Sequence, residues 1–122
     1  MTRSFIDSLN DMVTAIDDAR SFIASLDLDD FQASKEKQYA VIRALEIIGE
    51  AAAQIPAEIR TAYPNVPWRE IVGMRNVVIH NYSGVDETVI WRTVQEDLPP
   101  LKRSIKRILK DISRRRVRSL LV

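Results

Sequence analysis

The chain of 122 residues contains no cysteine and a single histidine. The absence of cysteine excludes disulfide bonds, thiolate nucleophiles and zinc sites built on sulfur, and it is typical of a reducing cytosol. One histidine leaves only carboxylates as further metal ligands, so we predict no metal site and no cofactor. Long apolar runs are also missing: none approaches the ~20 residues of a membrane helix, and residues 1–7 lack the apolar core of a signal peptide. We expect a cytoplasmic protein with no membrane partner.

Glycine and proline are scarce, with three and five residues respectively. Apolar residues recur at helical spacing through nearly the whole chain, which predicts an all-α protein. Apolar content of 46% and charged content of 29% are ordinary for a globular fold, and the length suits one domain over residues 1–122. We predict a small up-and-down bundle of four to six helices.

The breaks in the apolar pattern set the expected helix boundaries. The predicted helices are at about 4–26, 34–55, 56–63, 87–98 and 101–116, and a motif-bearing helix starts at Pro67. Between them we predict a turn at 27–30 with a short helical turn at Phe31, a loop at 63–67 and a break at 83–85. Pro99 and Pro100 are expected to separate the last two helices. The tail from about residue 113 is expected to be flexible.

The second predicted helix is apolar almost all round, which implies contacts on more than one side. Its small residues, Gly49 among them, permit another helix to approach closely. The charges within residues 39–53 are Arg43, Glu46 and Glu50, and their spacing puts all three on one face. This face is either a narrow solvated stripe, or a source of carboxylates that meet Arg75 or line a cleft near His80.

The formal charge of +1 hides an asymmetry. Residues 101–122 contain nine Lys or Arg and only one acidic residue, Asp111, a local charge of +8. The other 101 residues hold nine basic and sixteen acidic residues, a charge of −7. The basic end is either an amphipathic helix with a solvated cationic face or a positive surface that contacts an anion.

Residues 68–82 contain the only histidine, in an Arg-x-x-x-x-His-x-Tyr arrangement of Arg75, His80 and Tyr82. An imidazole transfers protons near neutral pH, and a guanidinium binds two phosphate oxygens while it stays charged. Asn76 lies one helical turn before His80 and is placed to orient it or to bond the phosphate. Taken alone, His80 is more consistent with a structural histidine at a helix end than with a catalytic one.

Helical geometry does not let one straight helix aim the three motif side chains at a single point. Arg75 and His80 lie about 140° apart around the axis, and His80 and Tyr82 about 160° apart. Either the helix ends near Asn81 and Tyr82 swings round, or two copies of the helix meet across a twofold axis. We favour the second arrangement, a homodimer, because the second helix has spare apolar surface to bury.

This motif resembles the signature of the HepT family of ribonuclease toxins in the HEPN superfamily. Three blocks carry the resemblance in order: ALEIIGEAA at 44–52, PWREIVGMRN at 67–76 and QEDLP at 95–99. The similarity covers about residues 5–112, and the Arg-rich end lies beyond it. It implies a homodimeric helical bundle in which the motif helices of both subunits form a shared cleft that cleaves RNA without a metal ion.

The resemblance also implies a toxin–antitoxin pair. The partner is a small nucleotidyltransferase antitoxin of the MntA type, which silences the toxin by attaching AMP to the motif tyrosine, Tyr82 here, and which forms a larger hetero-oligomer with it. Arg75 and His80 are then the catalytic residues, with Asn76, Glu46 and Glu50 in support. The alternative function is a non-catalytic helical dimer that binds a nucleotidyltransferase or a nucleotide.

Overall fold

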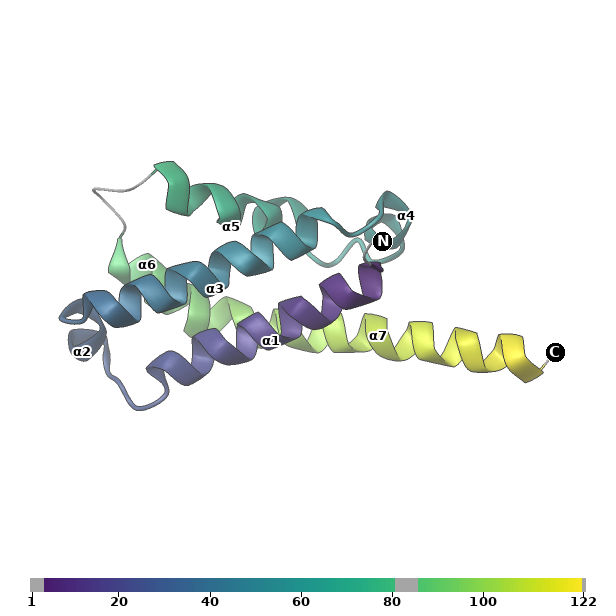
Figure 1. Ribbon diagram of the computed structural model, residues 1–122, viewed down its shortest axis with the longest axis horizontal. Coiled ribbons are helices and arrows are strands. Elements are labelled where there is room, and N and C mark those ends of the chain that lie inside the picture. Colours follow the sequence, from purple (N-terminus) through teal and green to yellow (C-terminus); the bar gives the residue numbers. More distant parts are fainter. Residues whose placement is uncertain (1–3, 81–85, 122) are drawn as a thin grey trace.

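The computed structural model describes the backbone of residues 4–80 and 86–121, and the side chains of these residues except 77–80 and 116–121. Every element in these ranges is helical, which confirms the predicted all-α bundle. Helix α3 (Lys35–Ala53) lies between α1 (Phe5–Ile23) and α5 (Trp68–His80), and α1 also packs on α7 (Leu98–Leu121), as Figure 1 shows. The short helices α2 (Leu28–Gln32), α4 (Ala57–Ala62) and α6 (Glu87–Arg92) complete the bundle.

Side-chain caps define where the first helices begin. Ser4 caps α1 by accepting from the N–H of Ile6, and Ser34 caps α3 by accepting from the N–H of Lys37. The stretch predicted as a turn is the helix α2, which Asp27 and Asp30 start with a reciprocal capping box. The predicted boundaries of the two long helices are therefore correct to within a few residues.

The ends of α2 and α3 are closed by long polar side chains from the next element. The amide of Gln38 donates to the carbonyl oxygens of Phe31 and Gln32 at 2.9 and 3.0 Å. The guanidinium of Arg60 donates to the carbonyl oxygens of Ala52 and Ile55 at 2.9 and 3.0 Å. These bonds add to the backbone bonds at the helix ends, where Phe31 already accepts from the N–H of Ser34 and Ala52 from the N–H of Ile55.

The core lies where α1, α3 and α7 meet. Its most deeply buried side chains are Leu9, Met12, Ile16, Ile23, Phe31, Val41, Ile48, Val94, Leu98, Ile105 and Ile108. The ring of Phe31 packs against that of Trp91, with centroids 5.6 Å apart and planes tilted by 44°. Trp68 is also buried, so both tryptophans serve the core.

The predicted break at Pro99 and Pro100 is wrong, because the chain stays helical from α6 through to α7. A π-helical turn, η1 (Thr93–Asp97), joins them, and the N–H of Leu98 bonds to the carbonyl of Thr93, five residues back. A proline in an α-helix lacks an N–H and crowds the carbonyl four residues earlier. The wider π turn relieves this crowding at the one place where two prolines follow.

Helix α7 is consequently longer than the predicted 101–116, and it runs past the end of the bundle (Figure 1). Besides its buried apolar residues, polar side chains tie it to other parts of the bundle. The ammonium of Lys102 lies 2.6 Å from a carboxylate oxygen of Asp17 on α1, and the hydroxyl of Tyr63 donates to Asp111 at 2.7 Å. No helix in the described part of the chain is long and apolar enough to cross a membrane.

Candidate functional site

The motif helix α5 begins directly after Pro67, as predicted. The indole N–H of Trp68 donates to the carbonyl oxygen of Tyr63 at 3.1 Å, which ties the first residue of the helix to the preceding loop. Trp68 and Ile71 are 7% and 2% exposed and point into the core. The first turn of α5 is therefore well anchored, and the motif follows along the same helix.

Helix α5 approaches α3 closely where Arg75 meets Gly49. A Cβ atom built on Gly49 would lie 2.7 Å from the backbone nitrogen of Arg75 and 3.1 Å from its Cβ. Real Cβ atoms do not come this close to backbone, so only glycine fits at this position. The predicted close approach at the small residues of the second helix is confirmed, and its partner is the motif helix.

Arg75 and Asn76 lie on the exposed surface of α5. The contact with Gly49 therefore fixes the backbone of Arg75 while its guanidinium remains accessible. His80 is the last residue of α5, and its side chain lies outside the described residues. Tyr82 also lies outside them, as does the predicted break at 83–85. The expected meeting of Arg75, His80 and Tyr82 stays a prediction.

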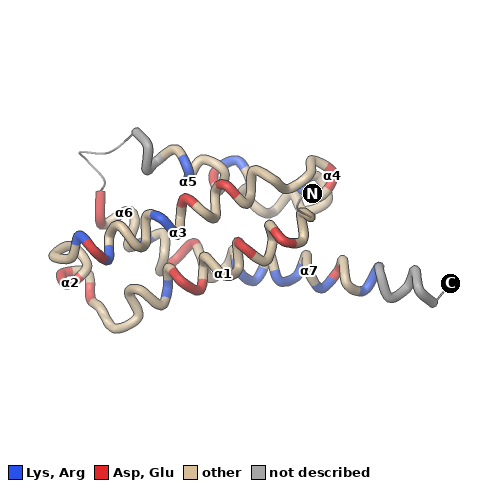
Figure 2. The backbone as a smooth tube through the Cα atoms, in the orientation of Figure 1, with Lys and Arg blue, Asp and Glu red and all other residues tan. Residues whose placement is uncertain are grey.

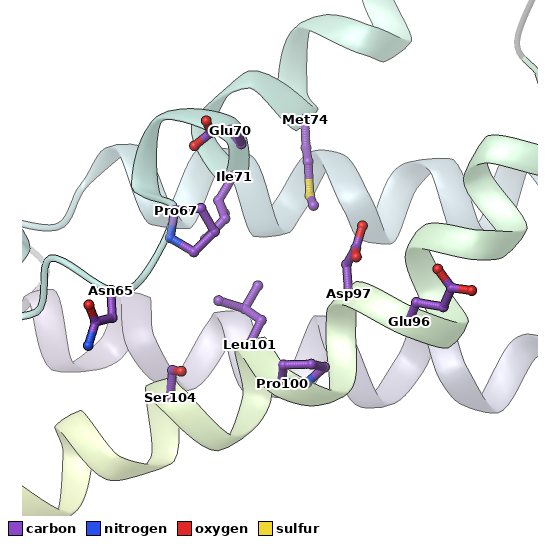
Figure 3. A pocket seen from close by; sticks show the side chains of 10 residues that line it. All are labelled: Asn65, Pro67, Glu70, Ile71, Met74, Glu96, Asp97, Pro100, Leu101 and Ser104. Carbon is purple, nitrogen blue, oxygen red and sulfur yellow. The ribbon is translucent and has the colours of Figure 1, made fainter.

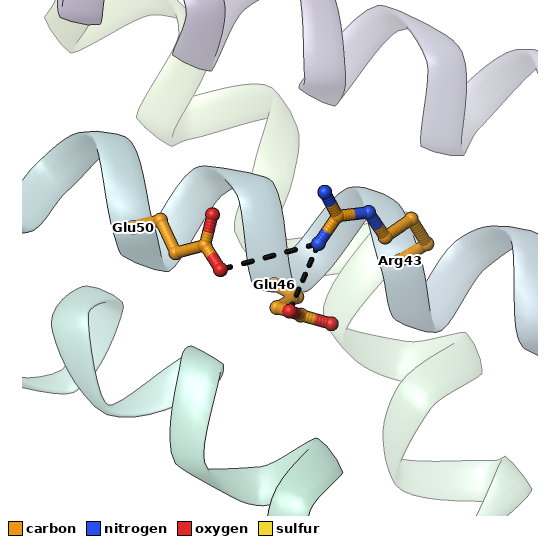
Figure 4. A network of polar contacts seen from close by, with 3 residues as sticks. All are labelled: Arg43, Glu46 and Glu50. Atoms are coloured by element: carbon orange, nitrogen blue, oxygen red, sulfur yellow. Dashed lines mark hydrogen bonds and ion pairs between the residues drawn. The ribbon is translucent and has the colours of Figure 1, made fainter.

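The two candidate carboxylates of α3 are bound to a residue of their own helix (Figure 4). The guanidinium of Arg43 donates to Glu46 at 2.9 Å and lies 3.9 Å from Glu50. Exposed fractions of 59% for Arg43 and 53% for Glu50 are those of a solvated stripe, and the alternative, carboxylates that meet Arg75 or line a cleft near His80, stays a prediction. Glu46, at 24%, is the least exposed of the three.

A groove of about 400 Å³ opens between α5 and the start of α7 (Figure 3). Its lining combines apolar side chains, such as Met74 and Leu101, with the carboxylates of Glu70, Glu96 and Asp97. Arg75 and Asn76 do not line it. Three carboxylates around an apolar floor repel a phosphate, so this groove is unsuited to RNA.

Basic residues recur along α7 (Figure 2), and most of the described ones are exposed. The exposed ones are Arg103, Lys106, Arg107, Lys110, Arg114 and Arg115. Lys102 differs from them, because it is half-buried and paired with Asp17. The hydroxyl of Tyr63 donates a hydrogen bond to Asp111. Partial burial of Tyr63 and, as a smaller cause, this hydrogen bond raise the pKa of its hydroxyl above the usual value of 10.0. The arrangement is compatible with both predicted roles of the basic end.

No group of three or more histidine, cysteine, aspartate or glutamate side chains among the described residues is arranged to hold a metal ion. Fold and motif together define a small all-α bundle protein that displays an arginine and an asparagine on an exposed helix. Comparison with known proteins makes the assignment specific. The ribonuclease HepT-like family model matches residues 12–108, and the chain belongs to this family.

Curated relatives agree with this assignment. A protein of Thermococcus cleftensis named "Probable ribonuclease HepT" is 46% identical over 110 residues, which cover 90% of this chain and all of the relative. "Putative RNase MJ0125" of Methanocaldococcus jannaschii is 41% identical over 104 residues, covering 85% and 90% of the two chains. No solved structure gives a significant match.

Proposed function

We propose that this protein is a metal-independent endoribonuclease and the toxin of a toxin–antitoxin pair. The observation that carries the proposal is the placement of Arg75, which is exposed on a helix whose backbone is clamped against Gly49. Membership of the ribonuclease HepT-like family and the names of the relatives support RNA as the substrate.

The chemistry follows from RNA itself, which carries a 2′-hydroxyl beside each phosphate. His80 takes the 2′-hydroxyl proton as the oxygen attacks phosphorus, the bond from phosphorus to the 5′-oxygen breaks, and the leaving oxygen receives a proton. Arg75 binds the phosphoryl oxygens through its planar fork and stabilises their added charge. The products are a 2′,3′-cyclic phosphate and a free 5′-hydroxyl. Asn76 orients His80 or holds the phosphate.

The active form is a homodimer in which the motif helices of two subunits face each other. This arrangement supplies two imidazoles to one cleft, one as the base and one as the acid. The exposed face of α3 supports such an interface, since Tyr39, one turn before Arg43 on the same face, is 67% exposed. Glu46 and Glu50 lie on this same face of α3, where both are paired with Arg43.

A nucleotidyltransferase antitoxin of the MntA type silences the protein by attaching AMP to Tyr82, within a larger hetero-oligomer. An adenylyl group close to Arg75 brings a bulky anion to the phosphate position, so it blocks RNA by occupancy and by like charge. Replacing Tyr82 by Phe removes the acceptor hydroxyl. The variant is expected to cleave RNA normally and to resist the antitoxin, whereas silencing of Y82F by the partner would refute this role.

Incubation of the pure protein with RNA in EDTA tests the activity. We expect cleavage that ends in 2′,3′-cyclic phosphates and that is lost in R75A and H80A. Both variants must remain folded, as judged by circular dichroism and melting temperature. An unmodified wild-type protein that leaves RNA intact, yet binds the nucleotidyltransferase tightly, would refute the enzyme and support a non-catalytic binding module.

A further inference from the structure

The ion pairs of α3 bind two carboxylates, Glu46 and Glu50, that lie near the helix contact with Arg75. Arg43 engages both Glu46 and Glu50 on the face of α3 that the three residues share. One guanidinium thus reduces a local charge of −2 to −1. Among the residues that the structure describes, Arg43 is the cation paired with these carboxylates.

The contact at Gly49 brings Arg75 to the same part of α3. Gly49 lies between Glu46 and Glu50 in sequence, and its Cα faces the backbone of Arg75 directly. Glu46 projects from about one turn earlier and about 60° around the helix. Glutamate and arginine side chains are long and flexible, so Arg75 is the natural alternative partner of these carboxylates.

We propose that Arg43 is a positioning residue that keeps Glu46 and Glu50 away from Arg75. Because Arg43 holds both carboxylates, the guanidinium of Arg75 stays available to an RNA phosphate. Without Arg43, the carboxylates act as an internal competitor for the phosphate-binding group. This inference rests on the proposed role of Arg75 in RNA cleavage, and it assigns Arg43 a function in substrate binding rather than in stability.

Kinetics of the R43A variant test the inference. A carboxylate that competes with RNA for free Arg75 raises KM and leaves kcat unchanged at saturation. We expect KM to rise about two- to five-fold, the range set by one exposed ion pair. The triple variant R43A/E46Q/E50Q lacks the competing charges and is expected to recover the wild-type KM, while R43K keeps the cation and should behave as wild type.

Lys35 provides a matched control for the loss of one positive charge. It is an exposed cation in the first turn of α3, far along the helix from Glu46 and Glu50. K35A therefore lowers the net charge by the same amount without releasing either carboxylate. An equal rise of KM in K35A and R43A, or a triple variant that stays impaired, would overturn the inference.

A second measurement separates this inference from the proposed activity. The Nε–H signal of Arg75 in a ¹⁵N spectrum, assigned through its loss in R75K, reports directly on the bonding of the guanidinium. We expect its exchange with water to be fast in wild type, slowed several-fold in R43A and fast again in the triple variant. Unchanged exchange in R43A would refute the role of Arg43 whether or not the protein cleaves RNA, and absent cleavage would refute only the activity.

Discussion

A methyl group on Gly49 would lie 2.7 Å from the backbone nitrogen of Arg75 and 3.1 Å from the carbonyl oxygen of Ile71. In G49A, this overlap forces α5 away from α3 at a cost of about 1–3 kcal/mol. The better helix propensity of alanine recovers only about 1 kcal/mol. We therefore expect a lower melting temperature, together with weaker RNA cleavage because Arg75 moves.

Gly73 on the same motif helix supplies the control for this prediction. A Cβ on Gly73 meets nothing within 4 Å, so G73A gains helix propensity without a clash. We expect G73A to be about 0.5–1 kcal/mol more stable than wild type and fully active. Thermal unfolding of both variants decides the point, and a G49A variant as stable as G73A would show that α5 does not depend on this contact.

Tyr63 links the loop before α5 to α7 through its hydrogen bond to Asp111. Y63F removes the hydroxyl and leaves the carboxylate of Asp111 without this hydrogen bond. We therefore expect a loss of about 1 kcal/mol in the free energy of unfolding. Chemical denaturation at pH 7 measures the loss. A Y63F variant that unfolds at the same denaturant concentration as wild type would show that this bond adds nothing.

The same hydrogen bond predicts that the free energy of unfolding depends on pH. Partial burial and then the bond to Asp111 raise the pKa of Tyr63 in the folded protein above the unfolded value near 10. Its contribution to stability is therefore complete below pH 10 and is lost as pH rises through the folded-state pKa. Chemical denaturation between pH 9 and 12 should show that wild type loses more stability than Y63F. Parallel curves of unfolding free energy against pH for the two proteins would contradict the raised pKa of Tyr63.

Arg60 closes the C-terminal end of α3 with two charge-assisted hydrogen bonds, to Ala52 and Ile55. R60A removes both bonds, although Ala52 still accepts from the N–H of Ile55, and we expect it to lower the free energy of unfolding by about 1.5–3 kcal/mol. R60K retains a cation but lacks the planar fork, so it should fall between wild type and R60A. Equal stability of R60K and R60A would show that only the geometry of the guanidinium matters.

The exposed cations of α7 predict a salt dependence of RNA binding. If Lys106 and Lys110 each contact a phosphate, the double variant K106Q/K110Q reduces the slope of log K against log salt by about 1.4, at about 0.7 per contact to single strands. K102Q is the matched control, because Lys102 is paired with Asp17 and should leave the slope unchanged. Binding is measured with an H80A variant, and a slope unaffected by K106Q/K110Q would identify these cations as part of a solvated face.

Much of the bundle was predictable from local chemistry. Ser4, Ser34 and Asp86 are side chains that cap helices, and each caps one in the structure. The continuous helix through Pro99 and Pro100 was not predictable, because proline argues for a break and the compensating π turn has no reliable sequence signal. The partner of Asp111 was equally hidden, since Tyr63 lies 48 residues away in sequence.

The sequence by itself determined the helical class, the main helix starts, and membership of the family through the blocks around Arg75. These properties follow from spacing, caps and motif residues that lie close together in the chain. Only the tertiary structure decided that Gly49 receives the backbone of Arg75. Helical spacing places side chains on a face, but the packing of α3 against α5 selects which of the possible partners they meet.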